Sequence, residues 1–323
     1  MRGVTARILY YALHITGFVL LYLVLRKFDW ESFLGLFSSF RIQDFALGFT
    51  MLLIVYLLKT YRWQRINRSF GIHISYGTTL IYFLVSGFLS VITPGRLGEF
   101  ARIFFIRNKT GVSTMLASSS VILDRVWDVL ILSLLGGAGA VMIFGRFQMN
   151  ILSILLIAVI FILALLLIIF PTFLFKPLLY LTRKKEKWNT EIDAIYKNWR
   201  FNVKRLFLPG FLTTLIAFIA LAVIPLIFTS RLEQEVGMIP SISAVSISNM
   251  LAFLPITIAG FGTRELVFTE IWKILDYTAE SAITISTAYF ICNYLGSLVV
   301  GGLTYAVWFR KHFRLKEIRN AGS

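Results

Sequence analysis

Long apolar runs dominate the pattern of hydrophobic and polar positions along this chain. A membrane-spanning helix needs about 20 mostly apolar residues, and six runs come close to or exceed that length. They lie at 8–25, 45–61, 114–143, 151–171, 207–229 and 283–308. The pattern therefore predicts an all-α polytopic membrane protein with six full spans, in a single membrane domain that covers residues 1–323.

Two further apolar stretches are interrupted by proline and glycine. The first, 76–93, breaks at Pro94, Gly95 and Gly98, and the second, 241–259, breaks at Pro255, Gly260 and Gly262. Charged residues and a weaker helix follow each break. Because irregular backbone at membrane depth requires protein or a water-filled cavity around it, we interpret 76–109 and 241–280 as re-entrant helical hairpins.

The basic residues indicate an orientation, since cytoplasmic loops of membrane proteins are enriched in lysine and arginine. One basic group follows the span at 45–61, and others form a cytoplasmic loop at 172–206 and a cytoplasmic tail at 309–323. The first of these groups consists of Lys59, Arg62, Arg65 and Arg68. All basic groups fall on one side if the two broken stretches return to the side they entered from. Both termini are then cytoplasmic.

This topology contains an internal regularity. The order span, span, broken hairpin, span occurs at 8–143 and again at 151–308, and the two copies begin on opposite sides of the membrane. Inverted repeats of this kind are common in secondary transporters. The competing explanation is that any break in a membrane helix uses glycine and proline.

Composition supports the membrane class and limits the partners. Of 323 residues, 58% are hydrophobic and only 15% are charged, whereas a soluble chain has about 25% charged residues. The net charge of +16 lies in short clusters beside apolar runs. Such clusters favour anionic lipid headgroups, so we expect no nucleic-acid partner.

The cysteine and histidine residues do not indicate a disulfide or a metal site. The single cysteine, Cys292, cannot form a disulfide within the chain, and His14, His73 and His312 have no metal-binding spacing. No glycine-rich nucleotide-binding motif is present. We expect neither a cofactor nor a metal ion.

Charged residues at the two breaks are the first candidates for substrate binding. They are Arg96, Glu99 and Arg102 in the first hairpin and Arg264 and Glu265 in the second. A helix that restarts after a glycine directs unpaired N–H groups at its surroundings and favours phosphate or carboxylate. Arginine adds a planar donor fork for phosphate. The alternative is a salt bridge that anchors a loop at the membrane interface.

A second group of candidates lies inside the apolar run 114–143. Asp124 and Asp128 are four residues apart, on one face of a helix, with Arg125 between them. Charges inside a span face protein or water rather than lipid. Two interpretations remain open: an ion-pair staple between helices, or carboxylates that hold a substrate arginine or a coupling proton.

These motifs resemble a known family. The sequence Pro94-Gly95-Arg96-Leu97-Gly98-Glu99, followed by Arg102, is similar to a hallmark of the lysylphosphatidylglycerol synthase transmembrane region, also called the flippase-like domain. Asp124-Arg125 with Asp128 resembles its next motif, with Asp124 in place of the usual glutamate. The third motif corresponds to Leu254-Pro255, Gly260, Gly262, Arg264 and Glu265. The resemblance covers nearly the whole chain and implies the lipid-moving region rather than the synthase.

Three functions follow from these observations. The first is a transporter or flippase, not an enzyme, for an anionic phospholipid or a polyprenyl-phosphate lipid in the cell membrane. The second is a membrane-embedded transferase that acts on a polyprenyl-phosphate or phospholipid. The third is a non-catalytic subunit of an envelope-assembly complex, so the protein partners to consider are a second copy of the chain and a partner enzyme.

Overall fold

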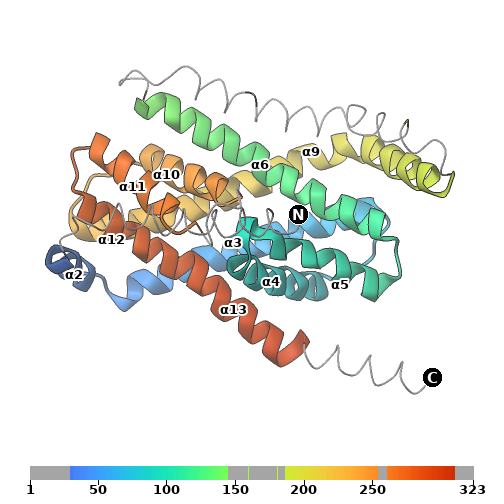
Figure 1. Cartoon of the computed structure of the whole chain (residues 1–323), viewed down its shortest axis with the longest axis horizontal. Helices are drawn as coiled ribbons and strands as arrows, with labels where there is room; N and C mark the ends of the chain where they lie inside the picture. Colours follow the sequence, from blue (N-terminus) through green and yellow to red (C-terminus); the bar gives the residue numbers. More distant parts are fainter. Residues whose placement is uncertain (1–29, 145–158, 160–179, 181–185, 254–259, 310–323) are drawn as a thin grey trace, which may run out of the picture.

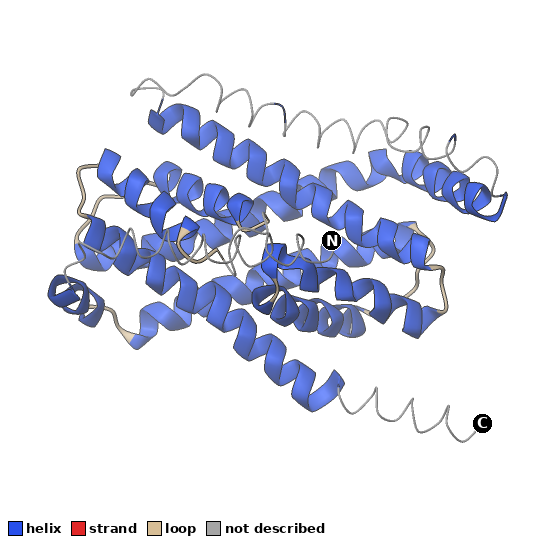
Figure 2. Ribbon diagram, in the orientation of Figure 1, coloured by secondary structure: helices blue, strands red, loops and turns tan. Residues whose placement is uncertain are grey.

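The computed structural model describes residues 30–144, 186–253 and 260–309, together with Val159 and Tyr180. Every regular element in these ranges is a helix (Figure 2), which confirms the predicted all-α class for the described part of the chain. The predicted span at 8–25, the predicted span at 151–171 (apart from Val159), Leu254 and Pro255, residues 172–185 of the predicted loop (apart from Tyr180), and residues 310–323 of the predicted tail lie outside the described residues.

The described elements follow one another in two groups along the chain (Figure 1). The first group is α2 (Trp30–Ser38), α3 (Ile42–Ser69), α4 (Tyr76–Ile92), the 3-10 helix η1 (Pro94–Phe100), α5 (Ala101–Thr110) and α6 (Thr114–Phe144). The second is α9 (Glu186–Thr229), the 3-10 turn η2 (Ser230–Leu232), α10 (Met238–Leu251), α11 (Thr263–Ile274), α12 (Ala279–Phe290), the π-helix η3 (Ile291–Leu295), α13 (Gly296–Thr304) and the π-helix η4 (Tyr305–Phe309).

Three described helical segments are long and apolar enough to cross a membrane. They are Ile42–Ser69, Leu206–Leu232 and Ala279–Val307, and they contain the predicted runs at 45–61, 207–229 and, except for its last residue, 283–308. The predicted run at 114–143 corresponds to α6, a helix of 31 residues that carries the Asp124, Arg125 and Asp128 charges along its length. The number of spans in the whole chain stays a prediction.

Helix α9 extends into the segment predicted as a basic loop. Its 44 residues run without interruption from Glu186 into the apolar span. Ile192, Ile195 and Trp199 repeat at helical spacing and are buried against the core, and the Trp199 ring contacts Phe70 at the end of α3 with centroids 6.5 Å apart. This apolar stripe stabilises helix over 186–206 despite the basic residues around it.

Both interrupted stretches form helical hairpins. Helix α4 begins at an N-cap, Ser75, whose hydroxyl accepts a bond from the Thr78 N–H, and it ends at η1, which returns the chain to α5. Tyr82 and Phe105 join α4 to α5, with ring centroids 5.4 Å apart. In the second half of the chain, α10 and α11 lie side by side in the same way (Figure 1). Whether the hairpins are re-entrant, and whether the two halves are inverted repeats, stay predictions.

The buried apolar residues form two clusters, and α3, α6 and α9 contribute to both. One cluster joins these helices to α4 and α5, and the other joins them to α10, α11 and α12. In Figure 1 the two hairpins accordingly lie toward opposite ends of the molecule, with α3, α6 and α9 running between them. The charged residues of the candidate site lie where the two clusters meet.

Candidate functional site

The first hairpin turns through two left-handed residues. Gly95 has φ 59° and Arg96 has φ 57°. Glycine adopts this conformation readily, but a side-chain residue there is strained and is often found at a functional site. The Thr93 hydroxyl holds the turn, because it accepts from the Gly98 N–H at 2.7 Å and donates to the Leu89 carbonyl at 2.8 Å.

Arg96 reaches from this turn to the second half of the chain. Its Nη2 donates to Asn249 Oδ1 on α10 at 2.9 Å and to the Tyr294 hydroxyl on η3 at 3.2 Å. The guanidinium carbon also lies 5.6 Å from the centre of the Tyr294 ring. Among the described residues, Arg96 forms no ion pair with a carboxylate.

The π-helix η3 supplies polar side chains to the site. Single π-helical turns in membrane and soluble proteins frequently mark functional positions, and η3 contains Asn293 and Tyr294. The hydroxyl of Tyr289, on the preceding turn, accepts from Asn249 Nδ2 and from Asn293 Nδ2, each at 2.9 Å. The asparagine and tyrosine side chains of these apolar runs therefore form one hydrogen-bonded group beside Arg96.

Arg264 of the second hairpin approaches the same tyrosine. Its guanidinium carbon lies 5.5 Å from the centre of the Tyr294 ring, so both hairpin arginines contact that ring. Arg264 is 1% exposed, is ion-paired with Glu265, and donates from Nε to Ser286 Oγ at 3.0 Å. The structure thus brings the two breaks together at Tyr294.

Glu265 also orders the break that precedes it. One of its carboxylate oxygens accepts from the Gly262 N–H at 2.8 Å, which caps the start of α11. Gly260 and Gly262 have φ values of 75° and 79°, a conformation for which glycine is suited. Arg264 Nη1 is buried and has no hydrogen-bond partner among the described residues.

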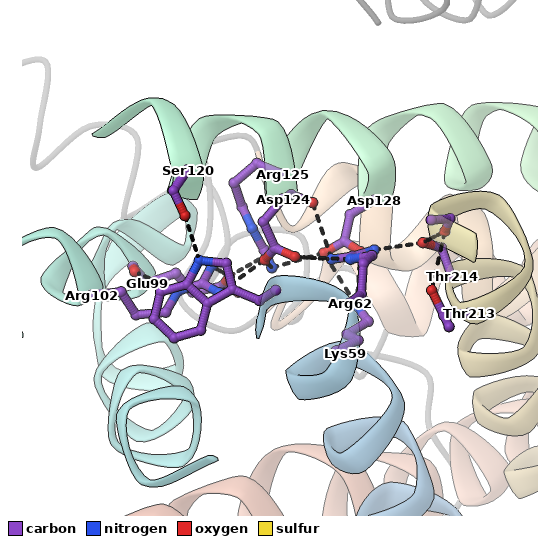
Figure 3. A network of polar contacts seen from close by, with 12 residues as sticks. Lys59, Arg62, Glu99, Arg102, Ser120, Asp124, Arg125, Asp128, Thr213 and Thr214 are labelled. Atoms are coloured by element: carbon purple, nitrogen blue, oxygen red, sulfur yellow. Dashed lines mark hydrogen bonds and ion pairs between the residues drawn. The ribbon is translucent and has the colours of Figure 1, made fainter. Parts of the chain in front are cut away.

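A second group of polar residues is a network of buried ion pairs (Figure 3). Arg62 on α3 donates from Nε to Asp124 Oδ1 at 2.8 Å and from Nη1 to Asp128 Oδ1 at 2.8 Å. Its Nη1 also lies 2.7 Å from the Thr214 hydroxyl of α9. Lys59, one turn earlier on α3, pairs with Asp128 at 3.2 Å. These contacts tie α3, α6 and α9 together.

The first hairpin and α6 complete the network. Arg102 donates to Asp124 Oδ2 at 2.8 Å and lies 3.4 Å from Glu99. Arg125 pairs with Glu99, with Asp124 at 2.9 Å and with Asp128 at 3.0 Å. The guanidinium of Arg102 stacks on Trp63, 4.7 Å from the ring centre. Five of the predicted site residues are therefore joined by ion pairs: Glu99, Arg102, Asp124, Arg125 and Asp128.

Lys59 and Arg62 are site residues that the sequence analysis assigned to a loop. The structure corrects that assignment, because both lie on α3 and are buried, with 8% and 2% of their surfaces exposed. Paired carboxylates on α6 make this burial tolerable. Their spacing of three residues, which puts two cations on one helix face, was the signal available in the sequence.

A cavity of about 70 Å³ opens between the network and the second half of the chain. Its charged lining consists of Lys59, Arg96, Glu99 and Arg125, and Asn249, Asn293 and Tyr294 face it from the other side. Since a buried water needs ~10–15 Å³ of such volume, the cavity has room for several water molecules or for a small polar group. Asp124, Asp128, Arg264 and Glu265 are not among the lining residues.

The charges of the site do not balance. Among the residues that the structure describes, the network and the cavity bring together five cations and three carboxylates: Lys59, Arg62, Arg96, Arg102 and Arg125 with Glu99, Asp124 and Asp128. The formal excess is two positive charges, and Arg264 with Glu265 adds none. In the described part of the chain, no group of histidine, cysteine, aspartate and glutamate residues could hold a metal ion. The arrangement is suited to binding an anion.

Apolar helices around a buried charged cavity define an integral membrane protein with an internal polar site. The chain belongs to the lysylphosphatidylglycerol synthase transmembrane region family, whose sequence model matches residues 8–301. It is also 26% identical over 242 residues to the UPF0104 membrane protein MJ1078 of Methanocaldococcus jannaschii, a match that covers 72% of this chain and 98% of that protein. These matches confirm the predicted family. Together with the apolar helices they support a multi-pass membrane protein of a family that is related to membrane lipids.

Proposed function

We propose that this protein moves an anionic, phosphate-bearing lipid across the cell membrane without changing it chemically. The observation that carries the proposal is the excess of two buried cations around a cavity, together with an arginine at that cavity, Arg96, that forms no ion pair with a described carboxylate. The family match supports a lipid as the partner.

Arg96 is the residue to which we assign the lipid phosphate. Ionisable groups inside a membrane domain are expensive and generally mark a substrate pathway. A guanidinium offers phosphate two parallel donors, and Arg96 reaches the cavity from a strained turn that fixes its direction. Glu99 and Arg125 line the same cavity and hold one another in place.

Arg264 is the second phosphate-binding residue of this proposal. It contacts the Tyr294 ring that Arg96 also contacts, but it does not line the cavity. A movement of the second hairpin relative to Tyr294 would exchange the two arginines at the cavity. Such exchange between hairpins gives a physical route to alternating access, as in transporters built from inverted repeats.

The membrane topology of the proposal has six spans, two re-entrant hairpins and cytoplasmic termini. It places α5 at the cytoplasmic surface and α11 at the external surface. Lys109→Cys and Glu270→Cys, both at exposed positions on these helices, test it with a membrane-impermeant thiol reagent. Labelling of Glu270→Cys in intact cells, and of Lys109→Cys after the membrane is opened, is expected. Labelling of both from the same side would refute the inverted arrangement.

A lipid-movement assay tests the function itself. The purified chain is placed in vesicles with fluorescent phosphatidylglycerol and an impermeant quencher, and wild type is compared with Arg96→Ala and Arg264→Ala. Movement is expected to fall in both variants and to persist in Arg65→Ala, an arginine on α3 whose side chain donates to Tyr61 rather than to the network. Equal movement in wild type and Arg96→Ala would remove Arg96 from the lipid path.

The same preparation separates the two other functions considered from the sequence. Turnover of a labelled lipid donor by the purified chain would favour a membrane-embedded transferase. Co-purification with a partner enzyme, and no lipid movement by the chain alone, would favour an envelope-assembly subunit. Either result would replace the transport proposal.

A further inference from the structure

The buried charges of the site point to the charge of its ligand. Each carboxylate of the network is already occupied: Asp124 by Arg62, Arg102 and Arg125, and Asp128 by Lys59, Arg62 and Arg125. Glu99 is shared between Arg102 and Arg125. These pairings leave Arg96 without a carboxylate in the described part of the chain, and the formal excess is two positive charges.

An uncompensated charge in a low-dielectric interior is costly. A ligand with two negative charges would bring the sum of formal charges at the site to zero. A ligand with one negative charge would leave one cation uncompensated. The difference between these two ligands is one full ionic interaction at short range, which is large wherever water is largely excluded.

The cavity also offers donors in the right place. Arg96 uses Nη2 for Asn249 and Tyr294, while its Nε and Nη1 have no hydrogen-bond partner among the described residues. Lys59, with its ammonium group against Asp128, lines the same cavity. A tetrahedral phosphate group in this space would meet a guanidinium and an ammonium, the two groups that commonly bind phosphate in proteins.

We propose that the site selects a phosphomonoester dianion over a phosphodiester monoanion, and that its ligand is a lipid whose head ends in a phosphomonoester. The lipid part of this inference rests on the proposed function, whereas the selection of a dianion does not. Free inorganic phosphate has the same recognition chemistry, so the experiment includes an arm for it.

Three small anions test the selection by binding to the detergent-purified full chain. Methyl phosphate, dimethyl phosphate and sulfate are titrated by calorimetry from pH 5 to pH 8. At pH 8 methyl phosphate is expected to bind about tenfold more tightly than dimethyl phosphate, or better, a ratio that one additional short-range charge interaction readily supplies. Equal binding of the two esters would overturn the proposal.

The pH profile provides an independent readout. A phosphomonoester dianion takes up a proton and becomes a monoanion near pH 6, so the advantage of methyl phosphate is expected to disappear below about that pH. Sulfate remains a dianion throughout this range and is expected to bind without the same decline. If sulfate shows the decline of methyl phosphate, the titrating group belongs to the protein and the argument from ligand charge fails.

Variants of the cavity relate the selection to the charge count. Arg96→Gln lowers the formal excess of positive charge from two to one. Its preference for methyl phosphate over dimethyl phosphate is therefore expected to decrease toward equal binding, whereas Arg96→Lys is expected to retain the preference. Arg65→Gln is the control, because Arg65 lies on α3 outside the network. If Arg96→Gln does not fold, the wild-type titrations with the three anions still decide the question.

Vesicle assays distinguish the sources of the phosphate. Fluorescent phosphatidic acid is expected to move faster than fluorescent phosphatidylglycerol, and radiolabelled inorganic phosphate is expected not to enter. One outcome is that the chain prefers methyl phosphate, admits inorganic phosphate into the vesicles and moves no lipid. The dianion site would then stand, but the lipid ligand and the proposed function would both be overturned. Another outcome is that both lipids move at the same rate and both esters bind equally. Lipid movement would then stand as the function, but the selection of a dianion would be overturned.

Discussion

Replacement of one buried carboxylate should destabilise the protein far more than replacement of an exposed one. Asp124 is fully buried on α6 and accepts from Arg62, Arg102 and Arg125 at 2.7–2.9 Å. Asp124→Asn keeps the shape of the side chain but removes its charge and turns an NH₂ group toward the arginines. The formal excess of buried positive charge then rises from two to three.

The expected loss follows from the cost of leaving one partner of a buried ion pair alone, which is about 3–5 kcal/mol. Asp193→Asn on α9 is the matched control. Asp193 pairs with Lys197 at 2.6 Å, but their side chains are 39% and 73% exposed. Exposed helical pairs of this kind contribute ~0.3–0.5 kcal/mol. The two substitutions, identical in chemistry, should therefore differ roughly sixfold or more in effect.

Equilibrium unfolding in mixed detergent micelles measures this difference. Tryptophan fluorescence is a suitable signal, because Trp63 and Trp127 are buried beside the network and become exposed on unfolding. A loss for Asp124→Asn no larger than that for Asp193→Asn would refute the reasoning, since it would mean that water already solvates the network.

Three further predictions concern the packing that positions the site. Gly98→Ala would place a methyl group against backbone of α4 and should cost at least ~1–3 kcal/mol, whereas Gly77→Ala meets no atom within 4 Å and should be neutral or slightly stabilising; unfolding titrations compare them. Arg231→Ala should lower the free energy of unfolding by ~1–3 kcal/mol, because it leaves the buried Asp44 carboxylate without its bidentate partner. If the double variant with Asp44→Ala loses less stability than Arg231→Ala alone, that cause is confirmed. Cys292 is buried and should react with a maleimide only on unfolding, so rapid labelling of the folded protein would contradict the packing of η3 against α3.

Much of the fold was accessible from local patterns. Apolar runs at 45–61, 207–229 and 283–308 indicated helices that the structure contains, since a span must satisfy all its backbone hydrogen bonds within itself. Glycine also predicted the two helix breaks, because it is the residue that most readily adopts a positive φ. Gly95 and Gly262 both have positive φ in the structure. The helical extension over 186–206 was harder to read, because its buried stripe is mixed with basic residues.

The candidate site was only partly accessible. The charged residues of the two breaks and of 114–143 were identified from their cost in an apolar run. Their pairing was not. The structure contains the ion-pair staple between helices that was one of the two interpretations of Asp124 and Asp128, and a substrate role for the charged residues stays a prediction. Asp124 and Asp128 act as the staple, whereas Arg96, Glu99 and Arg125 line the cavity.

Three features depended on the tertiary arrangement: Lys59 and Arg62 belong to the network, two arginines contact the Tyr294 ring, and the charges of the described site residues do not sum to zero. The partners of Arg62 are 62 and 66 residues away along the chain, and Tyr294 is 198 residues from Arg96. Helical periodicity relates residues three or four positions apart and carries no information about such distances. The apolar pattern was therefore sufficient to predict the long apolar helices, while the helix packing alone determined which buried charges meet and how many of them have no carboxylate partner among the described residues.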